Sequence, residues 1–164
     1  MNKFKSFRTT ILKWLVNHTA PIYMKIMKQK QIAWDYSIQD LRKFPSGSLG
    51  WELAEFLEGQ NLKLIPKAER HDVFHILTGY KTEPEEETMM QFWLLGNRKW
   101  TPYTIGTCAI GCILIPEHWS EFVIAFKKGW IAPSIYDLDY ENMLWMPVNN
   151  IKAHIQALPF GNYS

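Results

Sequence analysis

The chain has 164 residues, of which 47% are hydrophobic and 21% charged, and its formal net charge is +2, so we expect a single globular domain over residues 1–164. It has neither zinc-finger spacing nor an aromatic-rich ribonucleoprotein signature, which argues against nucleic acid as a partner. Two cysteines, Cys108 and Cys112, are too few for a disulfide framework, and buried thiols in a reducing compartment fit best.

Residues 1–36 form a basic segment. Across the first 50 residues, nine Lys or Arg face only Asp35 and Asp40. Six apolar residues here recur at helical spacing: Ile11, Trp14, Leu15, Tyr23, Ile26 and Met27. This pattern suits an amphipathic helix on a membrane surface, and equally a helix docked on the core. No cleavage site follows, so we expect the segment to stay in a cytoplasmic protein, placed peripherally on the inner face of the cell membrane.

Helical signals follow one another through the middle of the chain. Ser37 caps a helix over 37–44 that stops before Pro45, and Ser48 caps a second one that ends at Gly59. A third helix is predicted from Pro66 to Gly79. A fourth begins at Pro84, where early glutamates complement the helix dipole.

The last third also looks helical. Residues 104–116 are the most apolar stretch, but they fall short of the roughly 18 to 20 residues that span a bilayer. The segment 117–130 predicts a helix that ends at Gly129. Two short helices should follow: Asp139 caps the first, and Pro147 separates it from the second. Alternating strand patterns are missing. The prediction is therefore an all-α, single-domain bundle of about seven to nine helices.

Residues 70–87 read RHDVFHILTGYKTEPEEE and place two histidines four apart. On a helix, His71 and His75 lie within about 40° of each other, one turn apart, so both imidazoles can reach one ion. Asp72 lies at the edge of that face, as a third ligand, a partner that orients a histidine, or a general base. The opposite, core-facing side consists of Val73, Phe74, Ile76 and Leu77.

The remaining ligand must come from the next helix. Gly79 and Pro84 mark a turn, so that helix can fold back and bring an early residue close to the histidines. Glu87, twelve residues after His75, is the best candidate, and three other acidic residues stay open as alternatives: Glu83, Glu85 and Glu86. Such nitrogen and oxygen ligands suit a divalent metal, with zinc as the first choice and iron or manganese as alternatives.

A stripe of small residues occupies positions i, i+3, i+4, i+7 and i+8 of the apolar stretch: Thr104, Thr107, Cys108, Gly111 and Cys112. Such a stripe lets a neighbouring helix approach closely or leaves a groove for an isoprenoid chain. We favour close packing. The lipid-binding interpretation would assign the groove to Thr104, Cys108, Gly111 and Cys112.

At the histidine motif the sequence resembles a known family. HDVFH, eleven residues and then Glu87 match the motif of the coenzyme Q (ubiquinone) biosynthesis protein 4 family. Three further segments are similar to that family: PSGSLGWELAEFL, HILTG, and FKKGWIAPSIYDLDYENMLWMPVNNIKAHI. The resemblance covers residues 37–158, and it does not extend over residues 1–36.

The resemblance implies an all-helical protein with a metal held by His71, Asp72, His75 and Glu87. It also implies isoprenoid lipid or a quinone precursor, a membrane surface and other quinone-biosynthesis proteins as partners. The implied function is a metal-dependent factor of ubiquinone biosynthesis. Such a factor would perform the C1 oxidative decarboxylation of a polyprenyl-hydroxybenzoate precursor, organise the biosynthetic complex, or do both. Asp72 or Glu87 would act in catalysis by moving a proton if it does not ligate the ion.

Two other functions remain open. One is a non-catalytic scaffold that binds isoprenoid or quinone. The other is a zinc hydrolase, because His-Asp-x-x-His has the spacing of a zinc-peptidase motif, although Asp is one methylene shorter than the usual Glu. No flavin or nicotinamide fingerprint is present, so dioxygen or a partner must take the electrons of an oxidation. The lack of a mitochondrial presequence indicates a bacterial relative, and homodimerisation stays open.

Overall fold

The structure is a computed structural model that describes residues 7–8, 10–12, 14–15, 18 and 32–156. The described residues between 7 and 18 are helical, as the pattern of Ile11, Trp14 and Leu15 predicted. The predicted continuation through Tyr23, Ile26 and Met27 lies outside the described residues.

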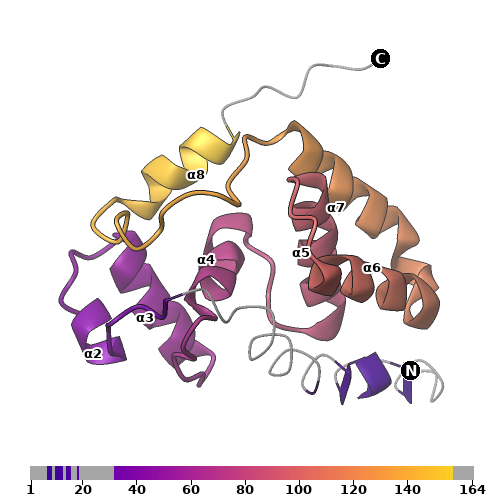
Figure 1. Ribbon diagram of the computed structural model, residues 1–164, viewed down its shortest axis with the longest axis horizontal. Coiled ribbons are helices and arrows are strands. Elements are labelled where there is room, and N and C mark those ends of the chain that lie inside the picture. The colour runs from indigo at the N-terminus through magenta and orange to yellow at the C-terminus, as the bar shows by residue number, and fades with distance from the viewer. Residues whose placement is uncertain (1–6, 9, 13, 16–17, 19–31, 157–164) are drawn as a thin grey trace. The chain divides into compact units, whose positions relative to one another are not determined.

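Helices make up the described part of the chain (Figure 1). They are α2 (Ile38–Leu41), α3 (Leu49–Gly59), α4 (Glu69–Thr78), α5 (Pro84–Gly96), α6 (Pro102–Leu114), the 3-10 helix η1 (Pro116–His118), α7 (Trp119–Ile131) and α8 (Val148–Gln156). Within these residues, β-pairing is limited to an isolated bridge between Ser48 and Pro147. The all-α prediction is confirmed, and the number of helices among the described residues falls in the predicted range.

Several helices begin where the sequence signals placed them. The Ser37 side chain accepts from the Asp40 backbone N–H while the Asp40 carboxylate accepts from Ser37, a complete capping box for α2. The Ser48 side chain accepts from the Trp51 backbone N–H at the start of α3, and Pro84 opens α5. These residues satisfy or remove backbone donors that a helix start leaves unpaired, which fixes the starts of the three helices.

The predicted start of a helix at Pro66 is wrong. Helix α4 begins at Glu69, because Lys67 has a φ of 70° in the left-handed region and breaks the helical run. Glu69 is buried at the new start, where its carboxylate accepts a hydrogen bond from the Trp34 backbone at 3.2 Å. The predicted end is confirmed, since Gly79 takes a φ of 79° and caps the helix.

Two predictions in the last third are also wrong. Helix α7 passes through Gly129 to Ile131. The helix expected after Asp139 is a series of turns, and α8 begins only after Pro147. The carbonyls of Leu144 and Met146 accept hydrogen bonds from the first N–H groups of α3, at 2.9 and 2.8 Å, so this segment caps another helix rather than forming its own.

The chain forms two compact units, each assembled from two separate stretches of sequence. One contains Ala33–Gly79 and Ile131–Ser164, and the other contains Met1–Ile32 and Tyr80–Trp130. The colours of Figure 1 show this discontinuity, because the first unit holds α2, α3 and α4 together with the yellow helix α8. Neither unit is a continuous piece of chain, and the single domain over residues 1–164 stays a prediction.

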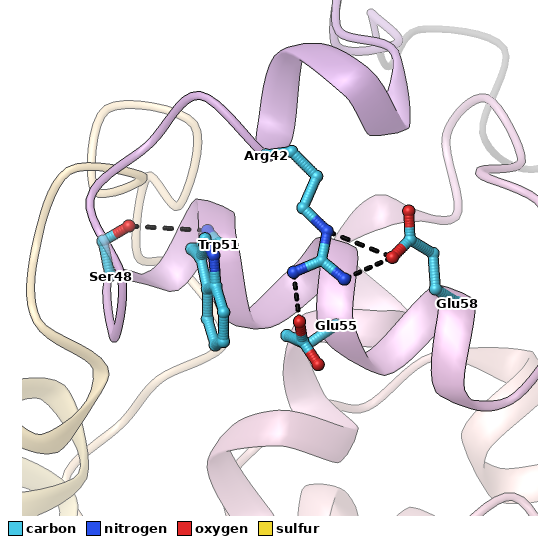
Figure 2. A network of polar contacts seen from close by, with 5 residues as sticks. All are labelled: Arg42, Ser48, Trp51, Glu55 and Glu58. Carbon is cyan, nitrogen blue, oxygen red and sulfur yellow. Dashed lines mark hydrogen bonds and ion pairs between the residues drawn. The ribbon is translucent and has the colours of Figure 1, made fainter.

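In the first of these units, α3 packs against α2 and α4, and α4 packs against α8. Its core is aliphatic and includes Leu41, Leu49, Leu53, Leu57, Val73, Leu144 and Ile151. Figure 2 shows how Arg42, just after α2, joins this helix to α3. Its guanidinium donates to Glu55 and Glu58 and lies 5.2 Å from the ring centroid of Trp51. Charge and stacking therefore hold the short α2 on the longer helix.

In the second unit, α5, α6 and α7 meet at glycines. A β-carbon on Gly129 would lie 1.9 Å from the Trp93 backbone oxygen, and one on Gly96 would lie 2.1 Å from that of Phe126. The side-chain amide of Asn97 donates to the Gly129 carbonyl at 3.1 Å. Gly96 and Gly129 therefore lie where α5 and α7 approach closely, and Gly129 serves this packing from within its helix.

No single helix in the described part of the chain is long and apolar enough to cross a membrane. The segments Pro102–Leu114 and Pro116–Ile131 meet the length and composition criteria only together, and they are bent by 108° at the break between them.

Candidate metal centre

His71 and His75 lie one turn apart on α4, as predicted. Their ring centroids are 4.9 Å apart and their planes meet at 72°. His75 is buried and stacks on Phe56 of α3, with a centroid distance of 5.5 Å and an interplanar angle of 18°. His71 is more accessible. The aromatic contact with α3 therefore fixes the His75 imidazole before any ligand binds.

The opposite side of α4 anchors the helix in the core. Val73, Phe74, Ile76 and Leu77 are all buried, which confirms the predicted core face. Phe74 also meets Tyr140 edge-on at 6.0 Å. Because this side is held by packing, the histidines are presented from a helix that is fixed in its rotation about its axis.

Asp72 lies beside His71. Its Oδ1 is 3.7 Å from Nδ1 of His71, and its side chain is largely buried, with 13% exposed. This position is close enough for the carboxylate to orient the imidazole, with a small adjustment to hydrogen-bond length. Ligation and general-base action by Asp72 both stay predictions.

Glu87 lies in the first turn of α5 and is buried, with 5% of its surface exposed. One of its oxygens accepts a hydrogen bond from the side-chain amide of Gln91 at 2.9 Å. The three alternative ligands are less buried than Glu87. Glu83 precedes the helix and is exposed, and Glu85 is half-buried. Glu86 already accepts a hydrogen bond from the Lys81 backbone N–H. Glu87 is the most buried of the four and offers an oxygen close to His71 and His75, so it is the strongest candidate.

His71, His75 and Glu87 can supply ligands to one ion. One nitrogen from each histidine and one oxygen from Glu87 all lie within 4.8 Å of one another. Two imidazoles and a carboxylate are the protein ligands of several catalytic zinc sites and of non-haem iron sites. The residues present thus fit a divalent metal. Asp72 is not part of this group of three.

The small residues of α6 face α5. A β-carbon on Gly111 would lie 2.4 Å from Cγ2 of Thr88, and the Thr104 hydroxyl donates to Gln91 of α5 at 3.2 Å. This contact is the close helix packing that we favoured for the stripe of small residues. Lipid binding by Thr104, Cys108, Gly111 and Cys112 stays a prediction.

Burial favours the neutral form of the two thiols of α6. It raises the pKa of Cys108 to about 12, with a smaller effect of Cys112, and it also raises the pKa of Cys112. Neither cysteine belongs to the group formed by His71, His75 and Glu87.

The sequence reading missed Gln91. This residue is fully buried and contacts the predicted ligand Glu87. The available signal was its position: Gln91 is the one amide in the otherwise apolar run MMQFWLL, and it lies one helical turn after Glu87.

Comparison with known proteins gives a match in structure only. No protein-family model matches the chain, and no curated protein does. A crystal structure from Nostoc punctiforme, whose name assigns it provisionally to ubiquinone biosynthesis, superimposes with a TM-score of 0.64. The two chains are 17% identical, and the match covers 94% of this chain and 81% of the other. At this identity the comparison shows that the two proteins share a fold.

Proposed function

We propose that the protein is a metal-dependent factor of ubiquinone biosynthesis that replaces the C1 carboxylate of a polyprenyl-hydroxybenzoate precursor by a hydroxyl group. One observation carries the proposal: His71, His75 and Glu87 offer three ligand atoms within 4.8 Å of one another. The fold shared with the Nostoc protein supports it, as do the motif and segments that resemble the family.

The proposed roles follow from the surroundings of each residue. His71, His75 and Glu87 hold the ion, and three protein ligands leave coordination positions for a substrate. When bound, the ion holds the substrate carboxylate and polarises the ring. Asp72, beside His71, orients that imidazole or exchanges a proton with the phenol. Zinc is the first choice of metal, with iron and manganese as alternatives.

The reaction is a two-electron oxidation. The bond between C1 and the carboxyl carbon breaks, and that carbon leaves as carbon dioxide. A C1–oxygen bond forms with an oxygen from water, and the two electrons and two protons released pass to dioxygen, which becomes hydrogen peroxide, or to an acceptor in a partner protein. In this proposal the described residues hold the metal and carry a proton, and dioxygen or a partner protein takes the electrons.

The proposed partners are an isoprenoid lipid or quinone precursor, a membrane surface on the cytoplasmic side, and other quinone-biosynthesis proteins. Exposed apolar side chains support an association with lipid. Ile105 and Ile113 on α6 are 47% and 75% exposed, and Trp130 at the end of α7 is 55% exposed. A homodimer is also proposed.

The first experiment measures metal content by elemental mass spectrometry after purification without chelators or affinity tags. Wild type is compared with the double variant His71→Ala/His75→Ala, and His154→Ala serves as a control for loss of an accessible histidine. We expect about one ion per chain in wild type and in the control, and none in the double variant. Empty wild-type protein, even after reconstitution with zinc, iron and manganese, would contradict the metal site.

The second experiment separates catalysis from scaffolding. Metal-loaded wild type is incubated with a prenylated 4-hydroxybenzoate, and the C1-hydroxylated product and carbon dioxide are measured, beside binding of the same lipid to the metal-free double variant. Turnover that is lost in the double variant supports the enzyme. If lipid binding is retained in the double variant and wild type shows no turnover with dioxygen or an added acceptor, the non-catalytic scaffold is the better description.

A further inference from the structure

A chain of four polar side chains runs through the contact between α5 and α6. Gln91 donates from its amide nitrogen to Oε1 of Glu87 at 2.9 Å, and the Thr104 hydroxyl donates to the Gln91 amide oxygen at 3.2 Å. The hydroxyls of Thr101 and Thr104 are 2.9 Å apart. Glu87 is thereby connected, through α6, to the residue that caps the start of that helix.

Burial makes these contacts costly to lose. Gln91 and Thr104 are fully buried, and Glu87 is 5% exposed. A buried amide or hydroxyl that loses its partner costs free energy because water cannot replace the bond. A glutamine in the buried run of α5 therefore requires its partners, and these are the ligand candidate Glu87 on one side and Thr104 on the other.

The donors and acceptors of the chain follow one another in order. Gln91 turns its NH₂ group toward Glu87 and its carbonyl oxygen toward Thr104. That carbonyl can only accept, so Thr104 uses its proton on Gln91 and must accept from Thr101. The Thr101 oxygen in turn accepts from the Thr104 backbone N–H at 3.2 Å. All three side-chain donors therefore point toward Glu87.

We propose that Gln91 and Thr104 are positioning residues for metal binding: they hold the Glu87 carboxylate in one orientation. This inference rests on the ion of the proposed function. A carboxylate has lone pairs on both oxygens, so Glu87 can accept from Gln91 and ligate an ion at the same time. Residues that hydrogen-bond to metal ligands typically change metal affinity by 10- to 100-fold when they are removed.

Three substitutions on α6 test the inference. Thr104→Val removes the hydroxyl and keeps the shape, whereas Thr104→Ser keeps the hydroxyl. Thr107→Val, one turn along, is the matched control, because Thr107 is also a buried threonine of α6. Affinities for Zn²⁺ and Co²⁺ are measured by competition with a chromophoric chelator. The absorption spectrum of the Co²⁺ form reports the ligand geometry, and circular dichroism confirms the helical fold.

We expect Thr104→Val to bind both ions about 10-fold more weakly than wild type and to alter the Co²⁺ spectrum. Thr104→Ser should restore affinity and spectrum, and Thr107→Val should match wild type. If Thr104→Val, folded, binds as tightly as wild type with the same spectrum, the positioning role is wrong while the metal site stands. Equal weakening in Thr104→Val and Thr107→Val would also overturn it, as a packing effect. If wild type binds neither ion, the proposed function fails as well.

A substitution on α5 gives a second line of test. Gln91→Leu deletes the direct donor to Glu87 at similar volume, so it should weaken metal binding at least as much as Thr104→Val. The double variant Gln91→Leu/Thr104→Val should be little weaker than Gln91→Leu alone, because Thr104 acts through Gln91. Full additivity of the two losses would contradict a single chain of action.

Discussion

His75 and His71 share a helix face but have different surroundings. His75 is buried against Phe56, whereas His71 is partly exposed and lies beside Asp72. Removing the His75 ring would leave a hole in the packing between α3 and α4, so its variants combine loss of a ligand with loss of core contacts. His71→Ala is the cleaner single change for testing metal ligation.

Asp72 can be tested at the same scale. Asp72→Asn keeps the shape of the side chain but removes its charge and its ability to carry a proton. If Asp72 moves a proton, we expect turnover to fall by about 10²- to 10⁴-fold while metal content stays near wild type. Turnover with prenylated hydroxybenzoate and metal content are measured on the same preparation. Loss of the metal in Asp72→Asn would instead favour direct ligation.

Most residues of the candidate metal centre could be predicted from the sequence. His71, His75 and Glu87 could be grouped because helical periodicity and the turn between Gly79 and Pro84 are local signals. The link from Gln91 to Thr104 could not be predicted, since it depends on how α6 packs against α5. Periodicity reports which side of one helix is buried, and it carries no information on which buried polar group a neighbouring helix supplies.

At the scale of helices, Gly129 and Gly106 form a matched pair. A β-carbon at Gly129 would collide with the Trp93 backbone oxygen, whereas one at Gly106 meets nothing within 4 Å. We expect Gly129→Ala to lower the free energy of unfolding by about 1–3 kcal/mol because α5 and α7 must separate. Gly106→Ala should raise the free energy of unfolding by about 0.5–1 kcal/mol, because alanine has a higher helix propensity than glycine. Urea unfolding measures both, and equal effects would contradict the proposed close contact.

The capping box of α2 predicts a dependence on pH. Lys43 and Ser37 hold the pKa of Asp40 below its ordinary value. A carboxyl group whose pKa is lowered by folding stabilises the protein above its unfolded pKa, and this contribution is lost as pH falls. The difference in unfolding free energy between wild type and Asp40→Asn should therefore be present at pH 7 and shrink below about pH 4. Lys43→Ala should reduce the difference at pH 7, since Lys43 has the largest effect.

Helix boundaries show where local signals were sufficient. Ser37, Ser48 and Pro84 act within one turn of their own helices, and those starts were predicted correctly. The segment after Asp139 was wrongly predicted to be helical. Its carbonyl groups at Leu144 and Met146 accept hydrogen bonds from α3, which lies almost a hundred residues earlier in the chain. Only the tertiary fold determines that choice.

For the molecule as a whole, metal removal should lower stability. A ligand that binds only the folded state stabilises it by RT ln(1 + [L]/Kd), which is about 2.7 kcal/mol at one hundred times Kd. Excess zinc should therefore raise the thermal midpoint of wild type, and a chelator should reverse the rise. The double variant His71→Ala/His75→Ala is the control and should show neither change. If neither zinc nor the chelator changes the thermal midpoint of wild type, metal binding to the folded state would be contradicted.

The fold class was predictable at this scale because strand patterns are missing everywhere and helix caps recur. The division of the chain into two units was not. Each unit joins stretches that are far apart in sequence, such as α4 and α8. The local sequence pattern of a helix does not predict which distant helix packs against it.

The contact between α4 and α8 has a consequence for synthesis on the ribosome. Helix α4, which carries both histidines, packs against α8, which comes much later in the sequence. The histidine helix therefore leaves the ribosome long before its packing partner does. During that interval the apolar side of α4 lacks its contact with α8. A chain that stopped before α8 would leave the histidine helix without this support, although His71, His75 and Glu87 had all been translated.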